Sequence, residues 1–203
     1  MKKSQETKER LLKVATSLIW QSSYDSVGVN EICKKAGVTK GGFYYHFETK
    51  ADLFYECSLH YWKNMKNDYD CIFSPVNSPL EQLEGLILFV LDHQQPQEKN
   101  PVSGCPFVTS GALCGNLNEK IRKAAEEISQ NIIKYHIVLL RSIKAEKLAN
   151  SDYDELQTAR ILYQFIQGVL IVGRVYRSLD MVKKDLREGV YKIVDLKQCH
   201  RKS

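Results

Sequence analysis

The sequence has no long hydrophobic run, which excludes a membrane-spanning helix. Its longest apolar region covers residues 161–175 and is interrupted by Gln164, Gln167 and Arg174, so it is too short and too polar to cross a bilayer. The first residues are charged and are not followed by the apolar segment of a secretory signal. We therefore expect a cytoplasmic protein without a membrane partner.

Closely spaced cysteine pairs are also missing. No two of the six cysteines form a C-x-x-C pair, so the sequence does not predict a structural zinc site. Cys57 and His60 share a helix face, but two ligands alone do not make a metal site. In a reducing cytoplasm the cysteines are expected to be free thiols. We predict neither a bound metal nor a cofactor.

Signatures of catalysis are absent as well. The sequence contains no G-x-S-x-G elbow, P-loop, H-E-x-x-H pair or dinucleotide-binding fingerprint. The glycine cluster at residues 111–115 lacks the lysine that a P-loop requires. The five histidines show no pairing that indicates a nucleophile and its base. These absences predict a protein that is not an enzyme.

What the sequence does contain is typical of a globular protein with a mild excess of positive charge. Its 203 residues suffice for one large or two small domains. They are 43% hydrophobic and carry a formal net charge of +5, which permits a polyanionic partner. Such a partner needs a matching surface, and residues 29–47 supply the clearest candidate.

Residues 29–47 have the pattern of two short helices joined by a tight turn. Ile32 and Ala36 share one face of the first helix, and Gly37 follows as a residue that can end it with a positive φ. Thr39 is suited to cap the second helix through its side-chain oxygen. This arrangement predicts a helix-turn-helix.

The second of these helices has an outer face that suits the DNA major groove. Phe43 and Phe47, four residues apart, are predicted to point inward. The polar and basic residues then remain outside: Lys40, Tyr44, Tyr45 and His46. Gly41 and Gly42 allow the backbone at the start of the helix to approach a phosphate or a base edge. The alternative is a small helical hairpin inside an all-α core.

The stretch from about Glu6 to Leu53 resembles the DNA-binding domain of the TetR/AcrR family of bacterial transcriptional regulators. The resemblance is carried by the turn at residues 36–38, the Phe-Tyr-Tyr-His-Phe run at residues 43–47 and Lys50. It implies binding to a palindromic double-stranded DNA operator, with Lys50 holding a phosphate at the start of the next helix. The implied DNA contacts are Thr39, Lys40, Gly41, Gly42, Tyr44, Tyr45, His46 and Lys50.

Helical spacing continues through the rest of the chain, and no strand or repeat is evident. The sequence predicts an all-α fold of about nine helices in total. Residues 1–54 are expected to form a three-helix head that contains the helix-turn-helix. Residues 55–203 are expected to form a larger helical domain for effector binding and dimerisation. One start signal in that domain, Ser78-Pro79-Leu80-Glu81, combines a capping residue, a first-turn proline and a capping glutamate.

The helix predicted from Tyr153 to about Leu179 is apolar on almost all sides between Ile161 and Val175. A helix that is hydrophobic all round should be buried all round, and a second copy of the chain is the natural cover. We therefore expect a homodimer. The candidate interface residues are Phe165, Gly168, Val169, Val172, Tyr176, Leu186 and Val190.

The resemblance also implies that a small-molecule effector binds in this domain and changes the spacing of the two DNA heads. Aromatic side chains are the candidates for lining its site, although an ordinary core position is the commoner role for each of them. They are Trp62, Tyr69, Phe89, Phe107, Tyr135 and Tyr163. The function expected is a dimeric repressor that the effector releases from its operator.

Two alternatives remain open. Cys105 lies at a loop-to-helix junction, where a lowered thiol pKa would make it reactive, so Cys105 and Cys114 are candidates for a redox or electrophile sensor. The other possibility is a helical module that binds small molecules or proteins and reads no DNA sequence. The affinity for a specific DNA sequence, compared with the affinity for bulk DNA, distinguishes this module from a regulator.

Overall fold

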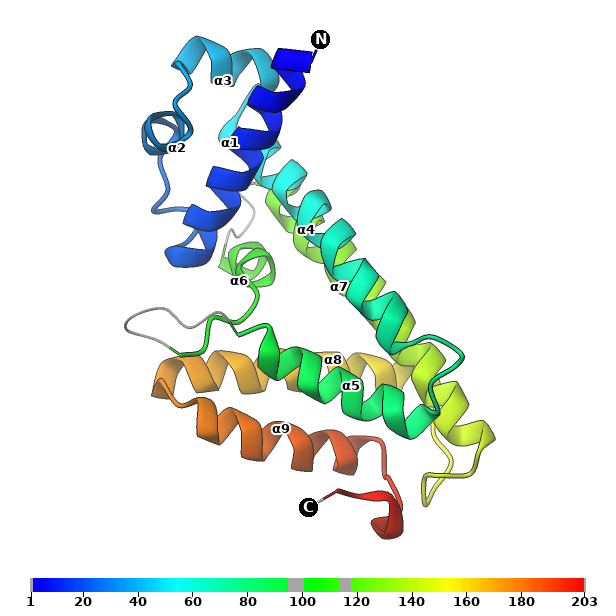
Figure 1. Ribbon diagram of the computed structural model, residues 1–203. Coiled ribbons are helices and arrows are strands. Elements are labelled where there is room, and N and C mark those ends of the chain that lie inside the picture. Colours follow the sequence, from blue (N-terminus) through cyan, green and yellow to red (C-terminus); the bar gives the residue numbers. More distant parts are fainter. Residues whose placement is uncertain (1, 95–100, 114–117, 203) are drawn as a thin grey trace. The chain divides into compact units, whose positions relative to one another are not determined.

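The computed structural model describes residues 2–94, 101–113 and 118–202, and omits the side chains of Lys2 and Lys3. Over these residues the protein is all-α, as predicted, with nine α-helices, one short 3-10 helix and no strand (Figure 1). None of the helices described is long and apolar enough to cross a membrane. The elements are α1 Lys2–Gln21, α2 Val29–Ala36, α3 Lys40–His46, α4 Lys50–Ile72, α5 Pro79–Asp92, α6 Pro106–Leu113, α7 Glu119–Ala145, α8 Glu155–Tyr176, α9 Leu179–Ile193 and η1 Gln198–His200.

Contacts between residues divide the chain into two compact units. Unit 1 comprises residues 1–65 and 105–128, and unit 2 comprises residues 66–104 and 129–203. Unit 1 therefore holds α1, α2, α3 and α6, whereas unit 2 holds α5, α8 and α9. Helices α4 and α7 contribute residues to both. The functional boundary expected after residue 54 is a different division of the chain and stays a prediction.

Unit 1 is built around the first three helices. Helices α1 and α2 pack against each other, and α3 follows α2 after a turn of three residues (Figure 1). The apolar stripe of α1 faces this core, as its helical spacing predicts. The fully or almost fully buried side chains of the three helices are Leu11, Ala15, Leu18, Ile19, Ile32, Ala36 and Phe43.

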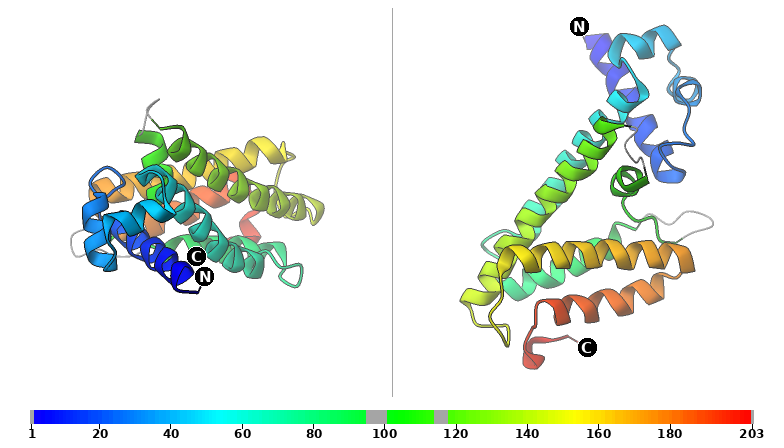
Figure 2. Two further views of the ribbon diagram at one scale, coloured as in Figure 1. Left: turned by 90° about the horizontal axis from the view of Figure 1, so that it is seen from above. Right: turned by 180° about the vertical axis from the view of Figure 1, so that it is seen from behind.

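Unit 2 is built around the antiparallel pair α8 and α9, which lie side by side in the views of Figures 1 and 2. Two glycines permit this close approach. A Cβ atom on Gly173 would lie 2.1 Å from Val182 Cγ2, and one on Gly189 would lie 1.9 Å from Phe165 Cζ. Helix α5 begins with the predicted capping box, in which the Ser78 hydroxyl accepts from the Glu81 N–H. Local sequence signals therefore fix where this helix starts.

Helix α7 places a histidine in the core of unit 2. His136 has no exposed surface, and neither ring nitrogen has a hydrogen-bond partner among the residues described. Burial lowers the pKa of His136 to about 4 and outweighs the opposite effect of the Ala159 backbone. The imidazole is therefore neutral in the folded protein at neutral pH.

The buried His136 predicts acid sensitivity. Because its pKa is lower in the folded state than in the unfolded state, the unfolded chain binds an extra proton once the pH falls below about 6.5. Stability is expected to decrease by about 2 kcal/mol between pH 7 and pH 5 from this group. Urea unfolding at both pH values measures this loss. Between pH 7 and pH 5, a His136→Leu variant should lose less stability than the wild type, by the same amount. Equal pH dependence in the two proteins would contradict the assignment.

Candidate DNA interface

The turn between α2 and α3 is closed by the residues that the sequence singled out. Gly37 has a φ of 62°, in the left-handed region that glycine adopts without strain. The Val38 N–H donates to the Cys33 carbonyl at 3.0 Å, which satisfies one of the last carbonyls of α2. The Thr39 hydroxyl then accepts from the Gly42 N–H at 3.1 Å and caps α3.

Two phenylalanines fix the rotation of α3. Phe43 and Phe47 are buried, and their ring centroids lie 5.7 Å apart. Gly42 also belongs to this inner side, because a Cβ there would lie 2.8 Å from Val38 Cγ1. The structure thus explains Gly42 by packing against the turn rather than by an open approach to DNA. Gly41, in contrast, is exposed and has only the Thr39 hydroxyl near it.

The opposite side of α3 exposes two adjacent aromatic side chains. Tyr44 is 55% exposed and Tyr45 is 77% exposed. The Tyr44 ring meets Phe43 edge-on at 5.2 Å, and the Tyr45 ring meets His46 at 5.0 Å. Lys40 is exposed at the start of the same helix. This face therefore offers hydroxyls, an ammonium and an imidazole together, a combination able to contact phosphates and base edges.

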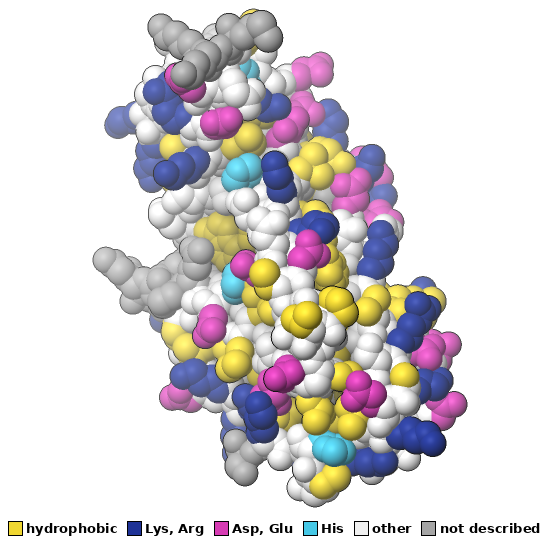
Figure 3. Space-filling model, turned by 45° about the vertical axis from the view of Figure 1, so that its right-hand side comes forward, with side chains coloured by type: hydrophobic (Ala, Val, Ile, Leu, Met, Phe, Trp, Pro, Cys, Tyr) yellow, Lys and Arg dark blue, Asp and Glu magenta, His cyan; other side chains and the backbone are white. Residues whose placement is uncertain are grey.

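Net charge alone does not locate the interface. On the face that Figure 3 shows, Lys and Arg side chains are interspersed with Asp and Glu. Within the head, the exposed Lys34 and Lys35 of α2 were not among the predicted contacts, although a first helix of this motif crosses the DNA backbone. Lys35 pairs with Glu31 at 3.3 Å. Their position together in the last turn of α2 was the sequence signal that could have marked both lysines as candidate phosphate contacts.

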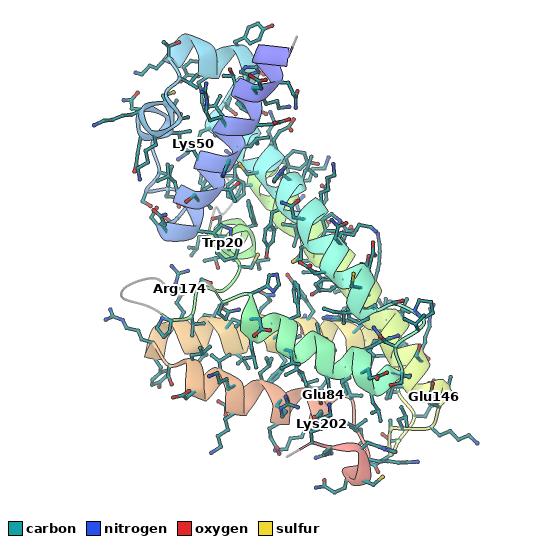
Figure 4. The ribbon with its side chains drawn as sticks, viewed as in Figure 1. Trp20, Lys50, Glu84, Glu146, Arg174 and Lys202 are labelled. Atoms are coloured by element: carbon teal, nitrogen blue, oxygen red, sulfur yellow. The ribbon has the colours of Figure 1, made fainter. Side chains whose placement is uncertain are left out.

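The structure differs from the prediction at Lys50. Its ammonium donates to the carbonyls of Tyr24 at 2.9 Å and Val27 at 3.2 Å, and it lies 4.0 Å from the Tyr24 ring centroid (Figure 4). Burial lowers the pKa of Lys50. Lys50 therefore ties the loop after α1 to α4, and a phosphate would have to compete with these internal acceptors.

The first turn of α4 is occupied in the same way. The Asp52 carboxylate accepts from the Thr49 N–H at 2.9 Å and from the Thr49 hydroxyl at 2.7 Å, and it also pairs with Lys120. The negative charge of Asp52 therefore already interacts with the positive end of the α4 dipole, at the position where a phosphate was expected. We leave Lys50 out of the proposed DNA contacts for this reason.

The candidate effector residues are divided between the two units. Tyr69, Phe89 and Tyr135 form an aromatic cluster in unit 2, with the Tyr69 ring 5.0 Å from Phe89 and 5.2 Å from Tyr135. Phe107 is buried in unit 1, 5.1 Å from Phe54. The Tyr163 hydroxyl is hydrogen-bonded to Ser129 at 2.6 Å. Trp62 is half-buried on α4.

The candidate dimer residues divide between surface and core. On α8, Gly168, Val172 and Tyr176 are exposed, and Phe165 and Val169 are partly exposed. Leu186 and Val190 of α9 have no exposed surface within the chain and lie in the core of unit 2, so they are left out of the proposed interface. Ile161, Ile171 and Val175 of α8 are exposed but were not predicted, because a helix that is apolar on all sides does not reveal its outer face.

The surroundings of Cys105 do not favour an activated thiol. Burial raises the pKa of its thiol to about 11, although the backbone N–H groups of Val108 and Phe107 act in the opposite direction. At neutral pH the thiol is therefore protonated and a poor nucleophile. The second candidate, Cys114, lies outside the residues described.

Cysteine alkylation tests this difference. Cys71 and Cys199 are exposed, whereas Cys105 is partly buried and the pKa of its thiol is raised to about 11. With iodoacetamide at pH 8, Cys105 is expected to react roughly 100-fold more slowly than the two exposed cysteines, because its raised pKa leaves little reactive thiolate. Mass spectrometry of time points gives the three rates. Fastest modification at Cys105 would restore the thiol-sensor interpretation.

Comparisons with known proteins agree with this geometry. The model of the family "Bacterial regulatory proteins, tetR family" matches residues 11–57. The transcriptional regulator AcrR of Shigella flexneri is 34% identical over 202 residues, which cover 95% of this chain and 90% of that protein. The transcriptional repressor NemR of Escherichia coli is 24% identical over 187 residues, covering 89% of this chain and 90% of that protein.

Solved structures show the same fold. The reduced form of Escherichia coli NemR matches with a TM-score of 0.79 at 22% identity, covering 93% of this chain and 97% of that chain. A TetR-family regulator from Agrobacterium tumefaciens matches with a TM-score of 0.82 at 16% identity, covering 93% and 98%. The chain therefore belongs to the tetR family of bacterial regulatory proteins and is a DNA-binding transcriptional regulator.

Proposed function

We propose that the protein is a dimeric repressor that binds a palindromic operator through α3 of both chains and is released by a small-molecule effector. The observation that carries this proposal is the exposed Tyr44–Tyr45 face, held outward by the buried Phe43 on the other side of α3. Two adjacent tyrosine rings exposed to water do not stabilise the fold of the head. Binding to a partner explains why they are there.

The chemistry of this face suggests a role for each contact. The Tyr44 and Tyr45 hydroxyls donate to phosphates while their rings meet sugars or thymine methyl groups. Lys40 and His46 bind phosphates or base edges. Thr39 and Gly41 bring the start of α3 close to the DNA backbone. Gly42 supports this approach from the inner side, because it lets α3 lie against Val38.

Helix α8 supplies the surface for the second chain. Its exposed and partly exposed apolar residues recur at helical spacing, so they form one stripe along the helix. The stripe consists of Ile161, Phe165, Gly168, Ile171, Val172 and Val175. Burying it against the same stripe of a second copy would remove these side chains from water and hold two α3 helices in a fixed relation.

Effector release follows from linkage. The two half-sites of an operator lie roughly 34–36 Å apart, and the two DNA-binding heads must match this spacing. A ligand that binds more tightly to a dimer with another head separation therefore lowers the operator affinity. The cluster of Tyr69, Phe89 and Tyr135 favours an effector with an apolar or aromatic body. The name of the relative NemR, a transcriptional repressor, supports repression over activation.

Gel-shift titration against genomic fragments selected by the protein tests the proposal. The selected operator should bind at least roughly 10³-fold more tightly than bulk DNA at physiological salt. Binding that is steeply salt-dependent and equal for all sequences would instead identify the module without sequence readout. The genes beside the selected fragments would then indicate the class of effector.

A further inference from the structure

Helix α9 and the C-terminal tail enclose a hollow with no place in the proposed function. Its volume is about 460 Å³, which matches a small molecule. Helix α9 contributes five of its lining residues and the tail contributes three. They are Lys183, Lys184, Arg187, Glu188, Tyr191, Gln198, Arg201 and Lys202.

The tail is held in place by specific bonds. The Lys202 N–H donates to the Tyr191 hydroxyl at 3.3 Å, and Arg201 Nε donates to the Leu196 carbonyl at 2.9 Å. Before the tail, the Asp195 carboxylate accepts from Ser151 at 2.7 Å. The wall of the hollow is therefore part of the fold of unit 2.

The lining is strongly basic. It carries five cationic side chains and one carboxylate, that of Glu188. Glu188 is turned to Lys192 at 3.0 Å, and Lys183 lies 3.8 Å from Asp180. Within the described part of the chain, neither Lys184 nor Lys202 forms a salt bridge, although the charge of Lys202 helps to lower the pKa of the Glu81 carboxyl. Like charges gathered in this way repel one another, and a bound anion would relieve that repulsion.

Arg187 is positioned for a more specific contact. Its Nη1 donates both to the Glu84 carboxylate and to the Tyr191 hydroxyl at 2.9 Å, and Tyr191 in turn donates to Glu84. Figure 4 labels Glu84 on α5 and Lys202 in the tail, which this network joins through Tyr191. The Arg187 side chain keeps 27% of its surface exposed.

Both bonds of Arg187 use the same nitrogen. Its Nε and Nη2 groups donate to no partner among the residues described, although the guanidinium lines the hollow. This free edge has the geometry that binds two oxygens of a phosphate at once. The buried Glu84, itself 7% exposed, holds the guanidinium through Nη1 rather than through that edge.

We propose that this hollow binds a small anion that carries phosphate groups. One phosphate lies against the Nε and Nη2 edge of Arg187, and Lys184 and Lys202 bind its further oxygens. The site shares no residue with the aromatic cluster or the DNA face.

Calorimetric titration of the full-length protein with inorganic pyrophosphate, at constant ionic strength, tests the site. A Lys184→Gln/Lys202→Gln double variant should lose affinity by roughly tenfold or more. A Lys63→Gln/Lys134→Gln variant makes the same charge change at exposed lysines elsewhere and should keep its affinity within about twofold. Arg187→Lys keeps the charge but loses the fork, so it should also bind about tenfold more weakly, with folding checked by thermal melting.

Three outcomes would overturn the proposal. No more heat from pyrophosphate than from sulfate at equal ionic strength would leave only general screening. An equal loss of affinity in both double variants would show a diffuse effect of surface charge. Tighter binding of citrate than of pyrophosphate would assign the hollow to polycarboxylates.

Discussion

Replacing Tyr44 with alanine is expected to weaken operator binding roughly 30-fold, a loss of about 2 kcal/mol for one side chain at the DNA surface. The physical reason is that Tyr44 exposes 55% of its surface on the outer face of α3, where its hydroxyl and ring are free to meet the DNA backbone. Fluorescence anisotropy with the selected operator measures the loss. Dimerisation and the melting temperature should change little, because the buried Phe43 holds α3.

A Tyr44→Phe variant is the matched control. It keeps the ring against Phe43, where the centroids are 5.2 Å apart, and removes only the hydroxyl. Its affinity should lie between those of the wild type and Tyr44→Ala. Unchanged affinity in Tyr44→Ala would remove this residue from the interface. Joint loss of dimerisation and DNA binding would show that Tyr44 supports the structure instead.

Placing two glutamates on α8, as Ile171→Glu with Val175→Glu, is expected to convert the dimer into a folded monomer. The two positions lie four residues apart and are 53% and 74% exposed, so each protomer tolerates the change. In an apolar interface, however, an unpaired carboxylate costs several kcal/mol. Operator affinity should fall by about 100-fold or more, because the second head no longer binds as part of the same molecule.

Sedimentation at about 10 µM protein, a concentration at which stable dimers persist, measures the oligomeric state. Titration with operator DNA measures the loss of affinity. Val76→Glu serves as the control, because Val76 is an apolar residue with 87% exposure outside the α8 stripe. It should leave both measurements unchanged. A double variant that remains dimeric would move the interface away from α8, and one that binds operator normally as a monomer would refute the two-headed arrangement.

The sequence predicts the head well because its signals are local. The end of α2 needs only Gly37 with a positive φ, and the start of α3 needs only Thr39 and an N–H three residues later. Phe43 and Phe47 select the inner face by their four-residue spacing. In unit 2 the capping box at Ser78 is equally local and equally clear.

The errors arise where a side chain finds its partner far along the chain. Lys50 bonds to carbonyls 23 and 26 residues earlier, which no short pattern announces. The pKa of Cys105 depends on how its surroundings bury the thiol, and not only on the adjacent helix start. Leu186 and Val190 match the exposed residues of α8 in type, so only the packing of α9 distinguishes them.

Methylation protection of the selected operator tests the central claim most directly, because it reports which groove is covered and how often. Two chains presenting α3 to successive turns should protect guanine N7 atoms in two symmetric major-groove patches, centred about 10–10.5 base pairs apart. Substitution of Tyr44 should weaken both patches together. A single patch, or protection confined to the minor groove, would contradict the account.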